Sequence, residues 1–171
     1  MRTSTLLLIG TLALASVLSF TPAREPETPP DEPVTFVLIR HAEKQTGAQD
    51  PRLTPEGLER ADRIASMLRS LGVGAVYSTD FARTRQTAAP LARAAGVPVR
   101  LYDPRHPGGL SDPPPGVRCV AIVGHSNTVP DLVRQLGGHA EAPELSEQVY
   151  DHVYLVTRFP DGRVVTHLLH S

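Results

Sequence analysis

Short apolar runs alternate along this chain with segments whose apolar residues recur every three or four positions. The runs at 34–39 (VTFVLI), 75–78 (AVYS) and 118–124 (RCVAIVG) have the length and composition of buried strands. Residues 54–71 and 81–95 lie between them and show helical spacing of apolar positions. Parallel strands need such crossover helices. The pattern therefore predicts an α/β three-layer sandwich with a mostly parallel central sheet.

The chemistry of single residues marks the ends of the first helix. Thr54 is a favourable N-cap, and Pro55 suits the first helical position, where its missing N–H is not needed. Gly72 is a plausible C-terminal stop. The buried face of this helix is predicted to consist of the apolar residues Leu58, Ala61, Ile64, Ala65, Leu68 and Leu71.

The second half of the chain predicts three further elements. A strand at 97–102 should lie at an edge of the sheet or begin after Pro98, because proline cannot donate a ladder hydrogen bond. Residues 129–136 form another helical face. The segments 152–159 and 164–169, joined by a "PDGR" turn, predict a terminal hairpin. No internal repeat or second domain is visible.

The N-terminal residues are predicted to lie outside the folded domain. Arg2, a following apolar run and small residues near Ala23 are typical of a secretory signal peptide at 1–23. The apolar run is shorter than the roughly 20 residues needed to span a bilayer, although an uncleaved anchor stays open. The segment 24–33 is charged and rich in proline, as in a flexible leader. We therefore expect a domain at 34–171 in an exported protein, periplasmic or secreted, with no membrane span after cleavage.

Charge and cysteine content exclude some classes of protein. The formal net charge is −1, which lacks the basic excess of a nucleic-acid-binding protein. The single cysteine, Cys119, cannot form an internal disulfide. It falls within an apolar run, which favours a buried and inert thiol. Nothing in the sequence indicates an oligomeric state.

Polar side chains follow several of the predicted strands or lie close after them. Arg40 and His41 end the first strand, Arg83 follows the second, Asp103 the third, and His125 the central one. Because ligands of α/β proteins collect at the carboxyl ends of strands, these side chains should converge there. Guanidinium groups match phosphate oxygens, and neutral imidazole is a competent nucleophile. The sequence therefore predicts an anion site with a nucleophilic histidine.

Four segments, in order, are similar to the signatures of the histidine phosphatase superfamily, which has the phosphoglycerate mutase-like fold: "RHAEK", "LTPEG", "YSTDFARTRQTA" and "VGHSNTVP". The resemblance implies that His41 is the nucleophile and forms a phosphohistidine. It implies that Arg40, Arg83 and His125 bind the phosphoryl group of a small phosphorylated substrate, with no cofactor. The expected activity is hydrolysis of phosphate monoesters.

Two details of the resemblance need a choice between residues. The family's second arginine fits Arg83 rather than Arg85, from its spacing to "QTA". The proton donor differs among members, and Asp103 lies about where mutase-like members carry a glutamate. Asp131 and Asp151 are the fallback candidates.

Other functions compete with phosphate ester hydrolysis. "GHSNT" partly resembles a serine hydrolase elbow, with Ser126 as nucleophile followed by Asp151 and either His167 or His170. A phosphoglycerate mutase-like phosphotransferase and an inactive phosphate-binding relative are the remaining alternatives. The short, proline-rich segment 104–117 favours an open pocket and hydrolysis.

No metal ion is expected. The arginines at 40 and 83, with a protonated His125, would supply the positive charge that the reaction needs. The remaining histidines show no metal-ligand spacing and are predicted to be surface or hairpin residues: His106, His139, His152, His167 and His170.

Overall fold

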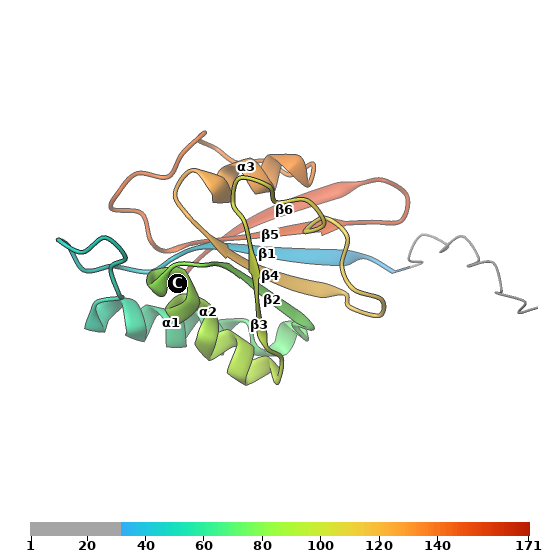
Figure 1. Cartoon of the computed structure of the whole chain (residues 1–171). Coiled ribbons are helices and arrows are strands. Elements are labelled where there is room, and N and C mark those ends of the chain that lie inside the picture. The colour runs from blue at the N-terminus through green and yellow to red at the C-terminus, as the bar shows by residue number, and fades with distance from the viewer. Residues whose placement is uncertain (1–31) are drawn as a thin grey trace, which may run out of the picture.

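The structure, a computed structural model, describes residues 32–171. Six strands form a single sheet in the order β3-β2-β4-β1-β5-β6 (Figure 1). The strands are β1 (Val34–Arg40), β2 (Ala75–Thr79), β3 (Val99–Tyr102), β4 (Cys119–Gly124), β5 (His152–Arg158) and β6 (Val164–His170). The first four are parallel, whereas β5 runs antiparallel to both β1 and β6. The predicted α/β fold with a mostly parallel sheet is confirmed.

Helices cover both faces of the sheet (Figure 1). α1 (Pro55–Met67) and α2 (Ala82–Ala95) lie on one face, and α3 (Thr128–Gln135) lies on the other. Successive residues of a strand point to opposite faces. In β1, Phe36 and Leu38 therefore pack on the α3 side, while Val37 and Ile39 pack toward α1 and α2. Both faces are covered, which explains why β1 and β4 are continuously apolar.

α1 begins as predicted, but the buried face of the helix is shorter than predicted. Thr54 Oγ1 accepts a hydrogen bond from the backbone N–H of Gly57 at 3.1 Å. A Cβ on Gly57 would lie 2.3 Å from the backbone oxygen of Glu43, so only glycine allows this close approach. Leu58 was predicted to be buried and is 44% exposed. The first turn of α1 packs against the backbone of Glu43 instead of the sheet, which leaves Leu58 outside the core.

The end of α1 also differs from the prediction. A 3₁₀ turn at Arg69–Leu71 follows the helix and leads into Gly72, whose φ of 63° is left-handed. Leu71, predicted on the buried face, lies in that turn and is 38% exposed. Cys119 is buried as expected, and burial raises the pKa of its thiol to about 11.

The predicted signal peptide, 1–23, and most of the predicted leader, 24–33, lie outside the described residues. Within the part of the chain that the structure describes, no helix has the length and apolar character needed to cross a membrane.

Candidate active site

The carboxyl ends of three parallel strands bring the predicted basic residues together. The register pairs Arg40 of β1 with Gly124 of β4, and Ser78 of β2 with Val123 of β4. The residues that follow these strands consequently share one edge of the sheet. There the ring centroids of His41 and His125 lie 5.6 Å apart, and Arg83 Nη2 lies 3.5 Å from Nδ1 of His125.

His41 is buried and held in one tautomer. Its Nδ1 lies 2.8 Å from the backbone oxygen of Ala42, which can only accept a hydrogen bond. Nδ1 therefore carries the proton, and Nε2 keeps its lone pair. Burial lowers the pKa of His41 to about 3, and the positive charges of Arg40 and Arg83 act in the same direction. The side chain is thus a neutral imidazole at neutral pH, as a nucleophile must be.

His125 also has a defined tautomer. A guanidinium group can only donate, so the contact from Arg83 assigns the lone pair to Nδ1 and the proton to Nε2. Nε2 lies 3.0 Å from Oγ1 of Thr79, which donates in turn to Oγ1 of Thr84 at 3.0 Å. Burial, followed by the charges of Arg83 and Arg40, lowers the pKa of His125 to about 4. In the free protein this residue is neutral, contrary to the expectation of a protonated His125.

Arg40 is 2% exposed and is held by the segment that precedes β5. Its Nη1 donates to the backbone oxygens of Ser146 and Val149 at 2.6 and 2.8 Å. The guanidinium carbon lies 4.2 Å from the ring centroid of Tyr150, whose ring is also 6.1 Å from that of His41. Nε of Arg40 is buried and has no hydrogen-bond acceptor among residues 32–171.

Arg83 is fixed by other residues than those that hold Arg40. Its guanidinium carbon lies 4.4 Å from the ring centroid of Phe81, and its Nη1 lies 3.8 Å from Oδ1 of Asp50. Asp50 also accepts hydrogen bonds from the backbone N–H of Ala82 at 2.9 and 3.1 Å, so it caps α2 as well. Nε of Arg83 is buried without an acceptor in the described chain. By contrast, Arg85 is exposed and pairs with Asp80.

Asp103 stands apart from these contacts. Its Oδ1 accepts from the backbone N–H of Arg105 at 2.9 Å, and its Oδ2 lies 3.3 Å from Nδ1 of His106. These contacts, the backbone one above all, lower the pKa of its carboxyl group. The carboxylate is therefore ionised at neutral pH and engaged within its own turn.

The two fallback acids are engaged elsewhere. Asp131 forms an ion pair with Arg134 at 2.6 Å. Asp151 lies 2.9 Å from Nδ1 of His170, and its pKa is lowered although burial acts against the shift. Among residues 32–171, neither carboxylate forms a hydrogen bond or an ion pair with His41 or His125.

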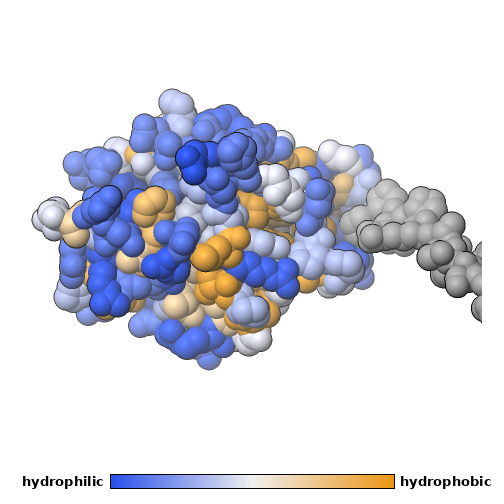
Figure 2. Space-filling view, in the orientation of Figure 1, coloured by the Kyte–Doolittle hydropathy of each residue, from blue (hydrophilic) through white to orange (hydrophobic). Residues whose placement is uncertain are grey.

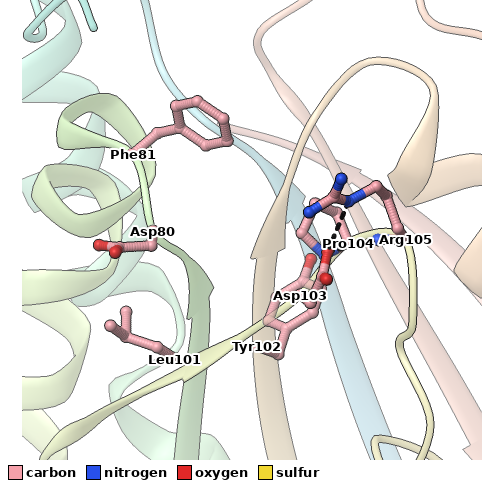
Figure 3. Close-up of a pocket in the computed structure, with 7 residues that line it drawn as sticks. All are labelled: Asp80, Phe81, Leu101, Tyr102, Asp103, Pro104 and Arg105. Atoms are coloured by element: carbon pink, nitrogen blue, oxygen red, sulfur yellow. Dashed lines mark hydrogen bonds and ion pairs between the residues drawn. The ribbon is translucent and has the colours of Figure 1, made fainter.

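A cavity of about 600 Å³ adjoins the cluster. In Figure 3, Phe81 and Leu101 lie on one side of it, and Tyr102, Asp103 and Arg105 lie on the other. The ring of Phe81 meets that of His125 edge-on at 5.2 Å between centroids, so the cavity lies beside the basic cluster. Leu101, in the wall of this cavity, is 55% exposed. Figure 2 shows that the face seen in Figure 1 carries apolar surface among hydrophilic surface.

The alternative nucleophile, Ser126, has a different environment. Its hydroxyl lies 3.0 Å from Oε1 of Glu144 and is not paired with a histidine. His170 pairs with Asp151, but Ser126 makes no hydrogen bond to that pair. The geometry does not support a serine hydrolase.

Several residues of the site have no signal in the sequence. Asp50 and Tyr150 are ordinary loop residues until the fold brings them to Arg83 and Arg40. Thr79 could have been suspected only from its place at the end of a strand. The backbone oxygens that bind Arg40 come from residues more than one hundred positions away.

We expect the stability of the protein to fall between pH 7 and about pH 5. An unfolded histidine binds a proton below about pH 6.5, whereas folded His41 and His125 resist protonation down to about pH 3 and 4. The unfolded state therefore binds more protons in this window, and acid favours it. The urea midpoint should be lower at pH 5 than at pH 7, and His41→Asn should reduce the difference. Equal midpoints in the unsubstituted protein would contradict the assigned protonation states.

Part of the chain matches the model of a known protein family. Residues 36–104 match the histidine phosphatase superfamily (branch 1). The matched region contains Arg40, His41 and Arg83 and ends before β4 and His125.

A relative and two solved structures extend the comparison. Over 75 residues the chain is 37% identical to "Probable phosphoglycerate mutase GpmB" of Escherichia fergusonii. The aligned region covers 40% of this chain and 34% of that protein. The chain thus spans about a third of the length of the curated relatives it matches. SixA from Nakamurella multipartitia is 24% identical, with a TM-score of 0.60 over 81% of this chain and 96% of that one. The protein histidine phosphatase SixA complexed with tungstate is 17% identical, with a TM-score of 0.62 over 80% and 97%. At these identities the two structures show the shared fold.

Proposed function

We propose that the protein is a histidine phosphatase that hydrolyses phosphate monoesters through a phosphohistidine on His41. The observation that carries the proposal is the buried, neutral His41, whose Nε2 lone pair lies in a cluster with two guanidinium groups. Nε2 attacks phosphorus and the bond to the alcohol oxygen breaks. Water then attacks the phosphohistidine, which releases phosphate and restores the imidazole. Membership of the histidine phosphatase superfamily, supported by the match at 36–104, is part of the proposal.

The charged neighbours of His41 have separate roles in this reaction. Arg40 and Arg83 each keep a buried Nε–H without an acceptor in the described chain. An unpaired buried donor of this kind is costly, so a phosphoryl oxygen is a fitting partner for the guanidinium groups. A bound phosphoryl dianion would also raise the pKa of His125 and let it hold a proton. The positive charge of the imidazolium would then develop where the transition state needs it.

Water is the proposed acceptor of the phosphoryl group. Leu110, in the segment between β3 and β4, is buried in the core on the α3 side, and the backbone oxygen of Ser111 accepts from Arg158 at 2.5 Å. The segment is thereby anchored to the α3 face of the sheet. We propose that this anchored segment leaves the site open, which favours hydrolysis over the re-delivery of phosphate that a mutase performs.

The leaving group is proposed to lie in the cavity beside Phe81. Its apolar wall, which includes Leu101, suits the carbon portion of an ester, and Arg105 suits a second anionic group. Asp103 remains the proposed proton donor, since it lines this cavity. Its lowered pKa argues against a strong donor role, which favours substrates whose leaving group needs little protonation.

A second candidate function follows from that limitation. The imidazole of a phosphorylated histidine leaves more readily than an alkoxide, because imidazole takes up a proton near neutral pH. The engagement of Asp103, Asp131 and Asp151 in other contacts favours such a substrate. One structural neighbour, SixA, is a protein histidine phosphatase, which is in keeping with such a substrate.

A panel of phosphorylated substrates tests the proposal. The full chain should hydrolyse a nitroaryl phosphate and a subset of alkyl phosphates or phosphohistidine, with the rate unchanged by EDTA. The two arginines supply the charge that a metal would otherwise supply, which is the reason to expect no metal requirement. Absence of hydrolysis across the panel would contradict the proposed activity. Loss of activity on chelation, restored by a divalent ion, would contradict metal independence.

Export also remains a proposal, because the signal-like segment lies outside the described residues. Detection of the protein in a periplasmic or culture fraction would test it, and retention in the cytosol would contradict it.

A further inference from the structure

A second cluster of polar side chains lies at the same end of the sheet, on its outer strands. Asp151 precedes β5, His152 begins that strand, and His170 ends β6. Because β5 and β6 are antiparallel, His152 and His170 lie directly opposite each other, with ring centroids 5.0 Å apart. The sequence spacing gave no metal signal for these residues, since the register of the hairpin is what joins them.

The cluster has the dimensions of a cation site. One candidate ligand atom from each of Asp151, His152 and His170 lies within 4.8 Å of the other two. A zinc ion with bonds of about 2.0–2.2 Å separates tetrahedral ligand atoms by roughly 3.3–3.6 Å. Side-chain rotations that move the ligand atoms by on the order of 1 Å would bring them to this separation. The distance from Nδ1 of His170 to Oδ2 of Asp151 is 2.9 Å, which is already shorter than the tetrahedral separation.

The surroundings orient two of the three ligands. Tyr154 is buried, and its ring packs edge-on against that of His152 at 5.9 Å between centroids. Its hydroxyl lies 3.5 Å from Nδ1 of His152, which leaves Nε2 directed toward Asp151 at 4.0 Å. The backbone N–H of Ser171 donates to the backbone oxygen of Asp151 at 3.0 Å, which fixes the main chain of Asp151 and joins the ends of the hairpin. Such outer contacts raise metal affinity by fixing the ligands before binding.

The positive charge of Arg60 does not rule out a metal ion at this cluster. Arg60 is close enough to Asp151 for each charge to act on the other. Its guanidinium group is neutralised by Glu43, with Nη2 to Oε1 at 2.6 Å. The side chains of Asp151 and His170 are 40% and 58% exposed, so an ion held there would keep room for water.

We propose that Asp151, His152 and His170 bind one divalent transition-metal ion of the zinc class. Two imidazoles and one carboxylate favour zinc over magnesium or calcium, which prefer all-oxygen ligands. Open water positions allow exchange with solvent. The ion would fix the end of the hairpin beside Tyr150, and it is separate from the phosphoryl chemistry at His41.

Calorimetric titration of the full, untagged chain with zinc in a non-coordinating buffer tests the site. We expect one bound ion, and at least a tenfold loss of affinity in His170→Ala and in Asp151→Asn, since even outer contacts of metal sites are typically worth about 10–100-fold. His167→Ala is the matched control, because His167 lies exposed on the opposite face of the same strand. It should bind zinc like the unsubstituted chain.

A spectroscopic readout separates this site from other histidines. The copper(II) form should show electron paramagnetic resonance couplings to two imidazole nitrogens, and His170→Ala should lose one. Zinc held instead by His41 and His125 would leave His170→Ala unchanged in both measurements and would overturn the proposal. Failure of the unsubstituted chain to bind either ion would overturn it too.

Discussion

His41→Ala should lower the rate of nitroaryl phosphate hydrolysis by at least ~10³-fold, since loss of a nucleophile removes the covalent route altogether. The reason lies in the tautomer: Nδ1 of His41 carries the proton and donates to the backbone oxygen of Ala42, so Nε2 of His41 keeps its lone pair. A nitroaryl phosphate needs little help from a proton donor, so its rate reports on nucleophilic attack. Steady-state kinetics on the purified variant would measure the loss.

Ser126→Ala is the matched control for that loss. It removes the nucleophile of the serine hydrolase alternative, and among residues 32–171 the Ser126 hydroxyl forms a hydrogen bond only with Glu144. This variant should keep most of the activity. Far-ultraviolet circular dichroism should show both variants folded. A folded His41→Ala with near-normal rates, or an inactive Ser126→Ala, would reverse the assignment of the nucleophile.

Arg83→Ala should lower kcat by about 10²–10³-fold, the usual cost of removing one preorganised donor to a transition-state oxyanion. The guanidinium group lies beside His125 and stacks on Phe81, so the charge is fixed before substrate arrives. Inorganic phosphate should also become a weaker competitive inhibitor of this variant. Kinetics with and without added phosphate would give both numbers.

Arg85 provides a control two residues away on the same helix. Its side chain is exposed and pairs with Asp80 outside the cluster, so Arg85→Ala should leave kcat and phosphate inhibition nearly unchanged. Equal losses in the two variants would mean that general charge, and not the position of Arg83, attracts the substrate.

Local patterns in the sequence were enough to predict most of the fold. β1 and β4 are continuously apolar because helices cover both faces of the sheet, so their runs could be recognised without any long-range information. The choice of Arg83 over Arg85 rested on family spacing, and the structure places Arg83 beside His125.

Contacts between distant segments could not be predicted in this way. Asp50 contacts Arg83 and, across 32 positions, the backbone N–H of Ala82 at the start of α2, and nothing in its local sequence marks it. The pairing of His152 with His170 depends on the register of the hairpin, which their spacing does not reveal. Leu58 fitted the helical period, but the first turn of α1 packs on the Glu43 backbone instead of the core.

Acid quenching during turnover tests the central claim most directly. The protein would be mixed with substrate, denatured within milliseconds, digested and analysed by mass spectrometry under conditions that preserve phosphohistidine. The account predicts a phosphoryl group on the peptide that contains His41, present in the unsubstituted protein and in Ser126→Ala, and absent from His41→Ala. A phosphoryl group on any other residue, or turnover with no trapped intermediate at any quench time, would contradict it.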